Sequence, residues 1–431
     1  MDTIFATATA LGKSGVAIVR VSGPRAWDAG TRLAGNLPAP GHAALRRLSD
    51  DTGGALDDAL VLCFKKGASF TGEDVVEFHL HGSVAILSVV LKSLGTMTGL
   101  RMAEPGEFTR RALENGCLDL TQVEGLGDLI EAETEAQRVQ ALRIFEGALG
   151  EKVGKWRRNL IRAAALIEAT IDFSEEEDLF DVIPQAAEIT EQTLIEIERE
   201  TEGGKVSERI REGFEVAIVG PPNVGKSTLL NRLAGRDAAI TSEVAGTTRD
   251  VIEVRMDLGG LPVTLLDTAG LRESEDLVEK LGVSRALRRA ESADLRIFLS
   301  DRNGAMNTAL KPSPDDIIVQ SKADLLHDNK KVAVSGLTGE GVDGLIESVR
   351  RKLEIRASGA GMTTRVRQRA ALLKSCVSLR AAIDGMRSST SGPELLAADL
   401  NMAIRALESV VGKIDVEHLL DEIFASFCLG K

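Results

Sequence analysis

The sequence predicts a multidomain protein with an N-terminal α+β domain, a discontinuous all-α helical domain, and an inserted α/β domain that carries a phosphate-binding loop. A chain of 431 residues is longer than one hydrophobic core usually supports. Strand and helix signals mix in residues 1–117 and alternate in residues 211–355, whereas residues 118–210 and 356–431 show helical periodicity. We expect the two helical stretches to form one domain, although helical modules in series would give the same pattern.

The composition is that of a globular protein without a membrane segment. Hydrophobic residues make up 43% of the chain, and the mean hydropathy is 0.00. No apolar run is long enough to cross a bilayer, and the first residues do not resemble a secretory signal. The four cysteines lie far apart, which favours reduced thiols in a cytoplasmic protein. A net charge of −13 disfavours diffuse binding to nucleic acid, so any such contact needs a local basic patch.

Residues 1–117 contain two charged residues inside apolar strand segments. The expected strands are Val16–Val21, Leu60–Phe64 and Val75–His79, and the expected helix is Val84–Leu94. Arg20 and Glu77 interrupt two of these strands. Alternating strand positions could simply place both side chains in solvent, and the sequence alone favours that explanation.

Apolar residues recur every three or four positions in both helical stretches. We expect Pro184 to open a helix that ends before Gly203–Gly204, and we take this glycine pair as a boundary. Gly412 separates two amphipathic helices near the C-terminus. Basic clusters at 155–158 and 365–369 could contact nucleic-acid phosphates, but such clusters are more often solvated helix faces.

The segment Gly220–Thr228, with the sequence GPPNVGKST, has the composition and position of a phosphate-binding loop. It follows the apolar strand Val216–Val219 and precedes leucines at helical spacing. In this context the backbone N–H groups of the loop and the helix N-terminus face an anion. We therefore expect Lys226 to reach the β- and γ-phosphates of a nucleotide and Ser227 to hold Mg²⁺. A chance glycine turn is the alternative, but further nucleotide signatures follow in the expected order.

Later strand ends complete the expected nucleotide site. Asp267 ends one strand and can bind Mg²⁺ through water, and the Gly270 N–H can meet a γ-phosphate. After the next such strand, the Asp324 carboxylate can accept both N–H donors of guanine, which adenine lacks. Lys322 should lie along the base, and residues 335–337 could offer a backbone N–H to guanine O6. The ordered set predicts a GTPase.

Position 321 departs from the usual Asn-Lys-x-Asp pattern of such proteins. Ser321 is shorter than asparagine and offers a hydroxyl instead of an amide. We predict a lower guanine affinity than in a Ser321→Asn variant, with specificity retained through Asp324.

The residue that orients the attacking water is not evident from these motifs. Leu271 stands where Ras-like proteins use glutamine. The polar candidates that follow are Arg272, Glu273, Glu275, Asp276 and Glu279. In the segment between the phosphate loop and Asp267, Thr248 is expected to complete the Mg²⁺ shell. In the phosphate loop, Asn223 is a candidate ligand for a monovalent cation. Spacing alone does not choose among these groups.

These motifs and both ends of the chain resemble the MnmE family, also called TrmE, of tRNA-modification GTPases. The resemblance covers essentially the whole chain. Its signatures are Thr3–Ala6, Arg20–Pro24, Phe70–Glu77, Pro105–Thr109, Asn115–Leu120 and the terminal Phe427–Lys431.

The resemblance implies a dimerising N-terminal domain, a discontinuous helical domain and an inserted G domain. It implies potassium-dependent GTP hydrolysis coupled to pairing of the G domains in a homodimer. It further implies a heterotetramer with the FAD-dependent protein MnmG. This complex would modify carbon 5 of the wobble uridine of tRNA (cmnm5U-type) with a one-carbon unit from tetrahydrofolate, in its 5-formyl or methylene form. A regulatory GTPase switch, such as a ribosome-assembly factor, is the alternative.

Carried over residue by residue, the resemblance implies functions for single side chains. Potassium would be held by Asn223, Ser242, Val244 and Thr247, and Mg²⁺ by Ser227 and Thr248. Glu279 would position the attacking water indirectly. The folate contacts would be Arg20, Glu77, Cys117 and Lys431, with Cys428 near the folate, although the family usually has lysine at position 117. The full set of expected GTP contacts is Asn223, Val224, Gly225, Lys226, Ser227, Thr228, Ser242, Glu243, Val244, Ala245, Gly246, Thr247, Thr248, Asp267, Thr268, Ala269, Gly270, Ser321, Lys322, Asp324, Ser335, Gly336 and Leu337.

Overall fold

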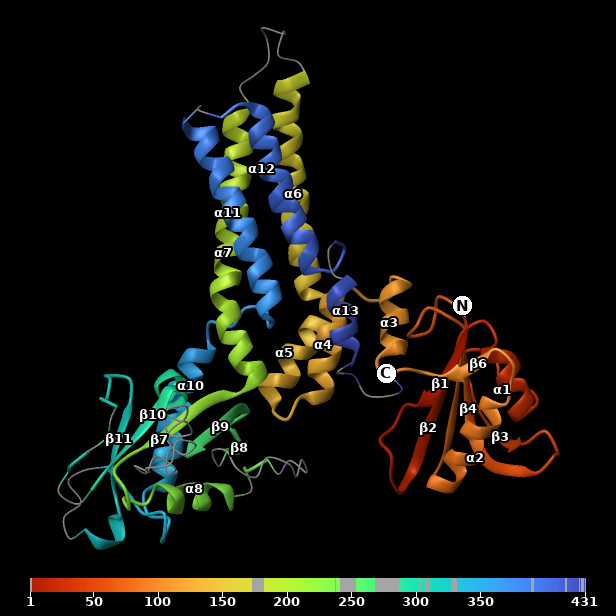
Figure 1. The fold of residues 1–431 in the computed structure, drawn as a ribbon, viewed down its shortest axis with the longest axis horizontal. Helices are drawn as coiled ribbons and strands as arrows, with labels where there is room; N and C mark the ends of the chain where they lie inside the picture. The colour runs from red at the N-terminus through yellow and green to blue at the C-terminus, as the bar shows by residue number, and fades with distance from the viewer. Residues whose placement is uncertain are drawn as a thin grey trace, which may run out of the picture. The chain divides into compact units, whose positions relative to one another are not determined.

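The computed structural model shows two compact units (Figure 1), residues 1–127 with 408–431, and residues 128–407. An α+β domain, a helical domain made of two separate stretches, and an inserted α/β domain are all present, so the predicted fold class is confirmed. None of the helices in the described ranges is both long and apolar enough to span a membrane. The structure describes residues 2–172, 182–236, 238–240, 253–267, 287–301, 304–306, 308, 310–326, 332–388, 391–414, 417–425, 427 and 430.

The first unit is built on a six-stranded sheet in the order β3–β4–β5–β2–β1–β6. Its strands are β1 (Thr3–Thr7), β2 (Ser14–Ser22), β3 (Ala43–Ser49), β4 (Ala55–Phe64), β5 (Val75–Gly82) and β6 (Leu100–Met102). All neighbouring strands are antiparallel except β1 and β6. Helices α1 (Ala26–Ala34) and α2 (Val84–Gly95) pack on one face and bury side chains such as Phe78 and Val61. The predicted strands and helix of this domain are confirmed.

The C-terminal segment belongs to the first unit. Helix α13 (Glu417–Ala425) contacts α3 (Glu107–Glu114). Gly106 allows this contact, because a Cβ there would lie 2.7 Å from a carbonyl oxygen of α13. Gly430 lies against the end of β1, where a Cβ would lie 1.9 Å from the carbonyl oxygen of Thr7. Glycine at both positions therefore lets the end of the chain approach the N-terminal domain closely.

Long helices that run side by side dominate the helical domain (Figure 1). The helices are α4 (Leu120–Glu131), α5 (Glu135–Phe145), α6 (Ala148–Asp172), α7 (Ile183–Glu212), α11 (Val366–Ser388) and α12 (Pro393–Val410). Pro184 lies in the first turn of α7, as predicted. Helix α7 contacts both α6 and α11, and Ser375 of α11 donates to the carbonyl oxygen of Ala403 of α12 (3.3 Å). The two stretches therefore form one domain rather than modules in series.

Helix α7 does not end at Gly203–Gly204, so that predicted boundary is wrong. The helix continues to Glu212, and the segment that leaves the α/β domain runs against the glycines. A Cβ on Gly203 would lie 2.7 Å from the Gly361 nitrogen. Glu200 fixes the same segment by accepting the backbone N–H of Thr363 (2.9 Å). The glycine pair serves the close approach of two backbones, not the termination of a helix.

The α/β domain has a six-stranded sheet in the order β12–β11–β10–β7–β9–β8, parallel except for β8. Its elements are β7 (Phe214–Val219), α8 (Lys226–Ala234), β8 (Glu253–Leu258), β9 (Leu261–Asp267), β10 (Leu295–Ser300), β11 (Ile317–Ser321), the short 3₁₀ turn η1 (Ala323–Leu325), β12 (Ala333–Val334) and α10 (Val342–Ala357). Because the carboxyl ends of parallel strands meet at one edge, the motif-bearing ends of β7, β9, β11 and β12 gather there.

Candidate functional site

The phosphate loop lies between β7 and α8, as the sequence predicts. A Cβ at Gly220 would lie 2.8 Å from the carbonyl oxygen of Leu299, so only glycine fits there. Gly225 and Asn223 adopt left-handed conformations, with φ of 108° and 60°, which turn the loop sharply. Lys226 donates to the carbonyl oxygens of Gly220 (2.9 Å) and of the next residue (3.0 Å). Its amine therefore lies over the loop that is expected to bind phosphate.

A hydroxyl and a carboxylate meet where the sequence predicts Mg²⁺. Ser227 Oγ donates to Asp267 Oδ2 at 2.9 Å, because β7 and β9 are paired neighbours. Oxygen atoms of both kinds suit Mg²⁺. Burial lowers the pKa of the Lys226 amine, and the charge of Asp267 partly opposes this shift. The cation, hydroxyl and carboxylate form the set that a nucleotide phosphate with bound Mg²⁺ requires.

Beside the phosphate loop lies a pocket of about 300 Å³. Its predicted lining residues are Val224, Gly225, Thr228, Ser321, Lys322, Asp324, Ser335, Gly336 and Leu337. The sequence analysis missed the apolar lining residues Leu229, Leu299, Leu325 and Val334. Leu229, Leu325 and Val334 belong to elements that carry a motif, so their proximity to the motifs was an available signal, whereas Leu299 lies on β10, which carries none. The structure thus gathers three separate motifs around one cavity.

Hydrogen bonds orient the carboxylate of Asp324 in this pocket. Ser335 Oγ donates to Asp324 Oδ1 (2.5 Å), and the Thr338 N–H donates to Ser335 Oγ (3.2 Å). Lys322 adopts a left-handed conformation, with φ of 60°. Gly336 allows the loop to approach α8, because a Cβ there would lie 2.7 Å from a backbone nitrogen of that helix. The acceptor that we expect to read guanine is therefore held in place before any base binds.

Several predicted residues lie outside the described residues. They are Ser242, Glu243, Val244, Ala245, Gly246, Thr247, Thr248, Thr268, Ala269, Gly270, Leu271, Arg272, Glu273, Glu275, Asp276, Glu279, Cys428 and Lys431. Their expected functions in binding the nucleotide, the metal ions and folate stay predictions.

Arg20 and Glu77 lie directly opposite each other on β2 and β5 of the first unit. Arg20 Nε is 2.8 Å from Glu77 Oε1, and the two side chains are only 21% and 14% exposed. The rings of Phe70 and Phe108 each lie 5.7 Å from the Arg20 guanidinium. The two side chains therefore form a largely buried ion pair and do not simply face the solvent, as the sequence alone favoured. The sequence analysis missed both rings, although each lies within a segment that carries the family resemblance.

Cys117 lies beside the loop that carries Phe70. A Cβ on Gly72 would lie 2.8 Å from Cys117 Sγ, and Gly72 is left-handed, with φ of 74°. The cysteine side chain is exposed. Cys117, a predicted folate residue, thus lies close to the loop that carries the Phe70 ring.

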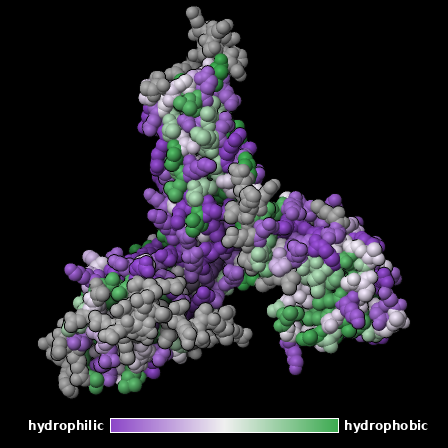
Figure 2. All heavy atoms as spheres, viewed as in Figure 1, coloured by the Kyte–Doolittle hydropathy of each residue, from purple (hydrophilic) through white to green (hydrophobic). Residues whose placement is uncertain are grey.

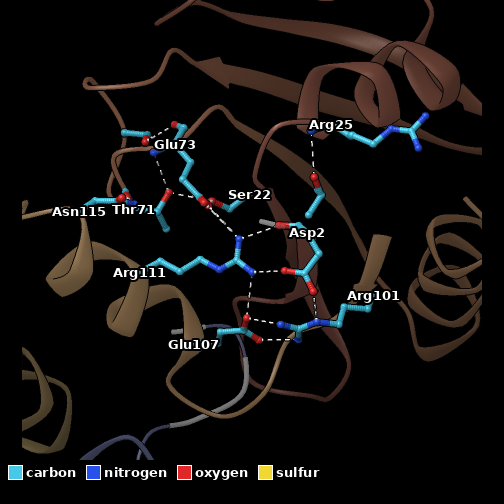
Figure 3. Close-up of polar contacts among 11 residues, drawn as sticks. Asp2, Ser22, Arg25, Thr71, Glu73, Arg101, Glu107, Arg111 and Asn115 are labelled. Carbon is cyan, nitrogen blue, oxygen red and sulfur yellow. Dashed lines mark hydrogen bonds and ion pairs between the residues drawn. The ribbon is translucent and has the colours of Figure 1, made fainter. Parts of the chain in front are cut away.

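Figure 3 shows a network of charged side chains centred on Arg111, which is buried together with Glu73 and Glu107. Arg111 of α3 donates to Glu73 (3.2 Å), to Glu107 (3.0 Å) and to the side chain of Asp2 (2.9 Å). Ser22 Oγ donates to the other carboxylate oxygen of Glu73 (2.6 Å). The network joins the N-terminus to the loop and the helix that carry the two aromatic rings.

Each of the two basic clusters contains ion-paired side chains. Lys155 donates to Glu196 (2.8 Å), and Arg369 donates to Glu208 (2.6 Å). These contacts are typical of helix faces that pair with their neighbours. They add no support for contact of these clusters with nucleic acid.

Two kinds of comparison with known proteins cover the chain from end to end. The family model described as GTP-binding protein TrmE N-terminus matches residues 3–117, and the model described as MnmE helical domain matches residues 120–428. Proteins named tRNA modification GTPase MnmE from Cereibacter sphaeroides (strain ATCC 17025 / ATH 2.4.3) and Dinoroseobacter shibae are 57% identical over 431 residues and 56% identical over 432 residues, with 100% of both chains covered in each case. On these matches, the chain belongs to the MnmE family.

Proposed function

We propose that this GTP hydrolase of the MnmE family, together with an FAD-dependent MnmG-type partner, modifies carbon 5 of the wobble uridine of tRNA with a tetrahydrofolate one-carbon unit. The relatives' name, tRNA modification GTPase, supports the reaction class. One observation carries the proposal: the same chain holds a guanine-type pocket and the Arg20–Glu77 pair flanked by aromatic rings. A GTPase that acts only as a switch needs the pocket but not the pair.

In the proposed GTPase site, each polar group has one function. Lys226 exchanges its two loop carbonyls for β- and γ-phosphate oxygens. Ser227 and Thr248 would hold Mg²⁺, which when bound neutralises phosphate charge. Asp324 accepts the guanine N1–H and the exocyclic amine, with its geometry preset by Ser335.

We also propose that hydrolysis requires potassium, held by Asn223, Ser242, Val244 and Thr247. Among these, Asn223 lies in the described part of the chain. It is a residue of the phosphate loop and has a left-handed backbone conformation. Its amide oxygen is a suitable ligand for a hard cation. Glu279 is proposed to position the attacking water indirectly. Hydrolysis in potassium buffer should be much faster than in sodium buffer, and equal rates would remove potassium from the mechanism.

The Arg20–Glu77 pair fits a folate by its chemistry. A pterin ring is flat and presents N–H donors that the Glu77 carboxylate can accept, and Phe70 and Phe108 offer aromatic surfaces. Arg20 suits the carboxylates or carbonyls of the same ligand. Cys117 and Lys431 are the further folate residues of the proposal. In its support, Gly430 lies against the end of β1, the strand that pairs with the Arg20 strand.

A homodimer is proposed through the sheet face that α1 and α2 leave uncovered. Ile18, His79, Leu60 and Leu45 form one row across this face, because the strand registers pair each with the next. Leu45 and Leu60 are 67% and 40% exposed. On the face of the first unit that Figure 2 shows, hydrophobic residues lie among hydrophilic ones. Exposed large hydrophobic residues such as these two leucines are typical of an interaction surface.

The decisive experiment is analysis of wobble uridines in tRNA from cells that lack this protein. We expect the carbon-5 modification to disappear and to return with the wild-type gene but not with a Lys226→Ala gene. Normal modification in the deletion strain would contradict the proposal and favour the switch alternative.

A further inference from the structure

The carboxylate of Glu77 has a second neighbour besides Arg20, the imidazole of His79. Glu77 and His79 are two residues apart on β5, so their side chains lie on the same face of the sheet. Arg20 Nε is 2.8 Å from Glu77 Oε1, and His79 Nε2 is 3.5 Å from Glu77 Oε2. Each oxygen of the carboxylate therefore has the nitrogen of a different side chain beside it.

The imidazole of His79 is only weakly engaged. A separation of 3.5 Å is long for a hydrogen bond, and neither ring nitrogen has a closer polar partner among the residues that the structure describes. The strand registers place the apolar residues Ile18 and Leu60 opposite His79 on the two neighbouring strands. The nearby carboxylate favours the tautomer in which Nε2 carries the proton. Because the side chain is 25% exposed, this N–H can still donate to a ligand that reaches Glu77.

The three side chains together present a row of hydrogen-bonding groups. Arg20, the two oxygens of Glu77, and His79 follow one another as donor, acceptor, acceptor and donor. One edge of a 2-amino-4-oxopterin carries O4, N3–H, the 2-amino group and N1, which are acceptor, donor, donor and acceptor. The row on the protein is therefore the complement of the pterin edge at each of its four groups.

We propose that His79 is a specificity-determining residue of the folate site, and that it donates to the pterin acceptor next to the N–H group that Glu77 Oε2 accepts. That acceptor is O4 or N1, according to which end of the edge lies at Arg20, and either one needs a donor at His79. The inference rests on the folate site proposed above. His79 lies outside the segments that carry the family resemblance, so the resemblance does not assign it.

The test measures the binding of 5-formyltetrahydrofolate to the full chain by calorimetry. His79→Met keeps a side chain of similar length but removes the donor, so affinity should fall about fivefold, which corresponds to a net hydrogen bond of about 1 kcal/mol. His79→Gln, whose amide also donates, should bind within twofold of the wild type. His79 belongs to the proposed dimer row as well, and methionine preserves an apolar side chain there.

His81→Met is the matched control. His81 lies on the same strand and the same face, but its Nδ1 is 2.7 Å from Asp57, and its side chain is 69% exposed. This variant should bind the folate as the wild type does. Undiminished binding by His79→Met, equal losses in His79→Met and His79→Gln, or an equal loss in His81→Met would each overturn the assignment to His79 and leave the folate site intact. Absence of binding to the wild type would instead remove the proposed folate site itself.

Discussion

The nucleotide site of the second unit and the Arg20–Glu77 pair of the first unit are built in different ways. The candidate nucleotide site collects residues that lie at, or shortly after, the carboxyl ends of parallel strands, so Lys226, Asp267 and Asp324 come together at one sheet edge. The pair lies on the face of an antiparallel sheet, and its aromatic neighbours come from two further segments.

This difference determines what each site depends on. A site of the first kind needs its motifs in the right order along the chain, because the topology of the parallel sheet does the rest. A site of the second kind depends on strand register, since a slip of one residue would turn Arg20 to the other face. It also depends on the Arg111 network that holds the surrounding segments.

The largest expected effect tests whether the two sites are chemically separate. Lys226→Ala removes the cation that is expected to meet the developing phosphate charge, so GTP hydrolysis should fall by about 10²–10³-fold. Folate binding to the same protein should stay within twofold of wild type. Phosphate release and calorimetry with a tetrahydrofolate measure the two effects. A parallel loss of folate binding would show that the sites are not separate.

The second largest effect is the reverse experiment. Arg20→Ala removes a charge-assisted contact to the folate, and its loss should weaken tetrahydrofolate binding by about 10–100-fold. Hydrolysis of GTP should be unchanged. Arg46→Ala is a control, because Arg46 is an arginine of the same sheet that donates to the backbone of Asn36 instead. If Arg20→Ala bound folate normally, the proposed folate site would be wrong.

A third effect concerns acid, and it should be confined to the first unit. Burial would raise the pKa of Glu107, but hydrogen bonds from Arg101, the Glu104 backbone and Arg111 outweigh it and lower the pKa. The stability that this carboxylate contributes is therefore present above its unfolded pKa of 4.5 and is lost as the pH falls through the folded value. Glu107→Gln should cost about 2 kcal/mol at pH 7 and make the remaining stability less sensitive to acid.

Fluorescence of Trp27 can follow this transition in a Trp156→Phe background, because the chain has two tryptophans and Trp27 is the one in the first unit. Glu114→Gln is the matched control, since Glu114 is exposed on the same helix. It should leave the acid transition unchanged. If stability fell with decreasing pH in Glu107→Gln as it does in the wild type, the Arg111 network would not be the cause of the acid sensitivity.

The sequence predicted the fold class, the position of the phosphate loop and most residues that line the candidate base pocket, because these depend on local patterns. The Gly220–Thr228 segment carries its own strand and helix signals, and Asp324 follows a clear strand. By contrast, the pairing of Arg20 with Glu77 joins residues 57 positions apart, and the sequence alone favoured two solvated side chains. The aromatic neighbours were missed for the same reason: only the folded sheet brings them to Arg20.

The smallest expected effect compares two glycines, one whose surroundings are open and one that another backbone approaches closely. In isolation, a glycine inside a helix predicts a weak point, and replacement by alanine should gain up to about 1 kcal/mol. Gly154→Ala in α6 should show that gain, because its nearest neighbour is the flexible end of Arg158 at 3.4 Å. Gly203→Ala in α7 should instead lose about 1 kcal/mol net, since the new Cβ meets the backbone of Gly361 and overpacking outweighs the helix propensity. Urea unfolding followed by Trp156 fluorescence in a Trp27→Phe background measures both. The same sign for the two variants would contradict the close approach at Gly203.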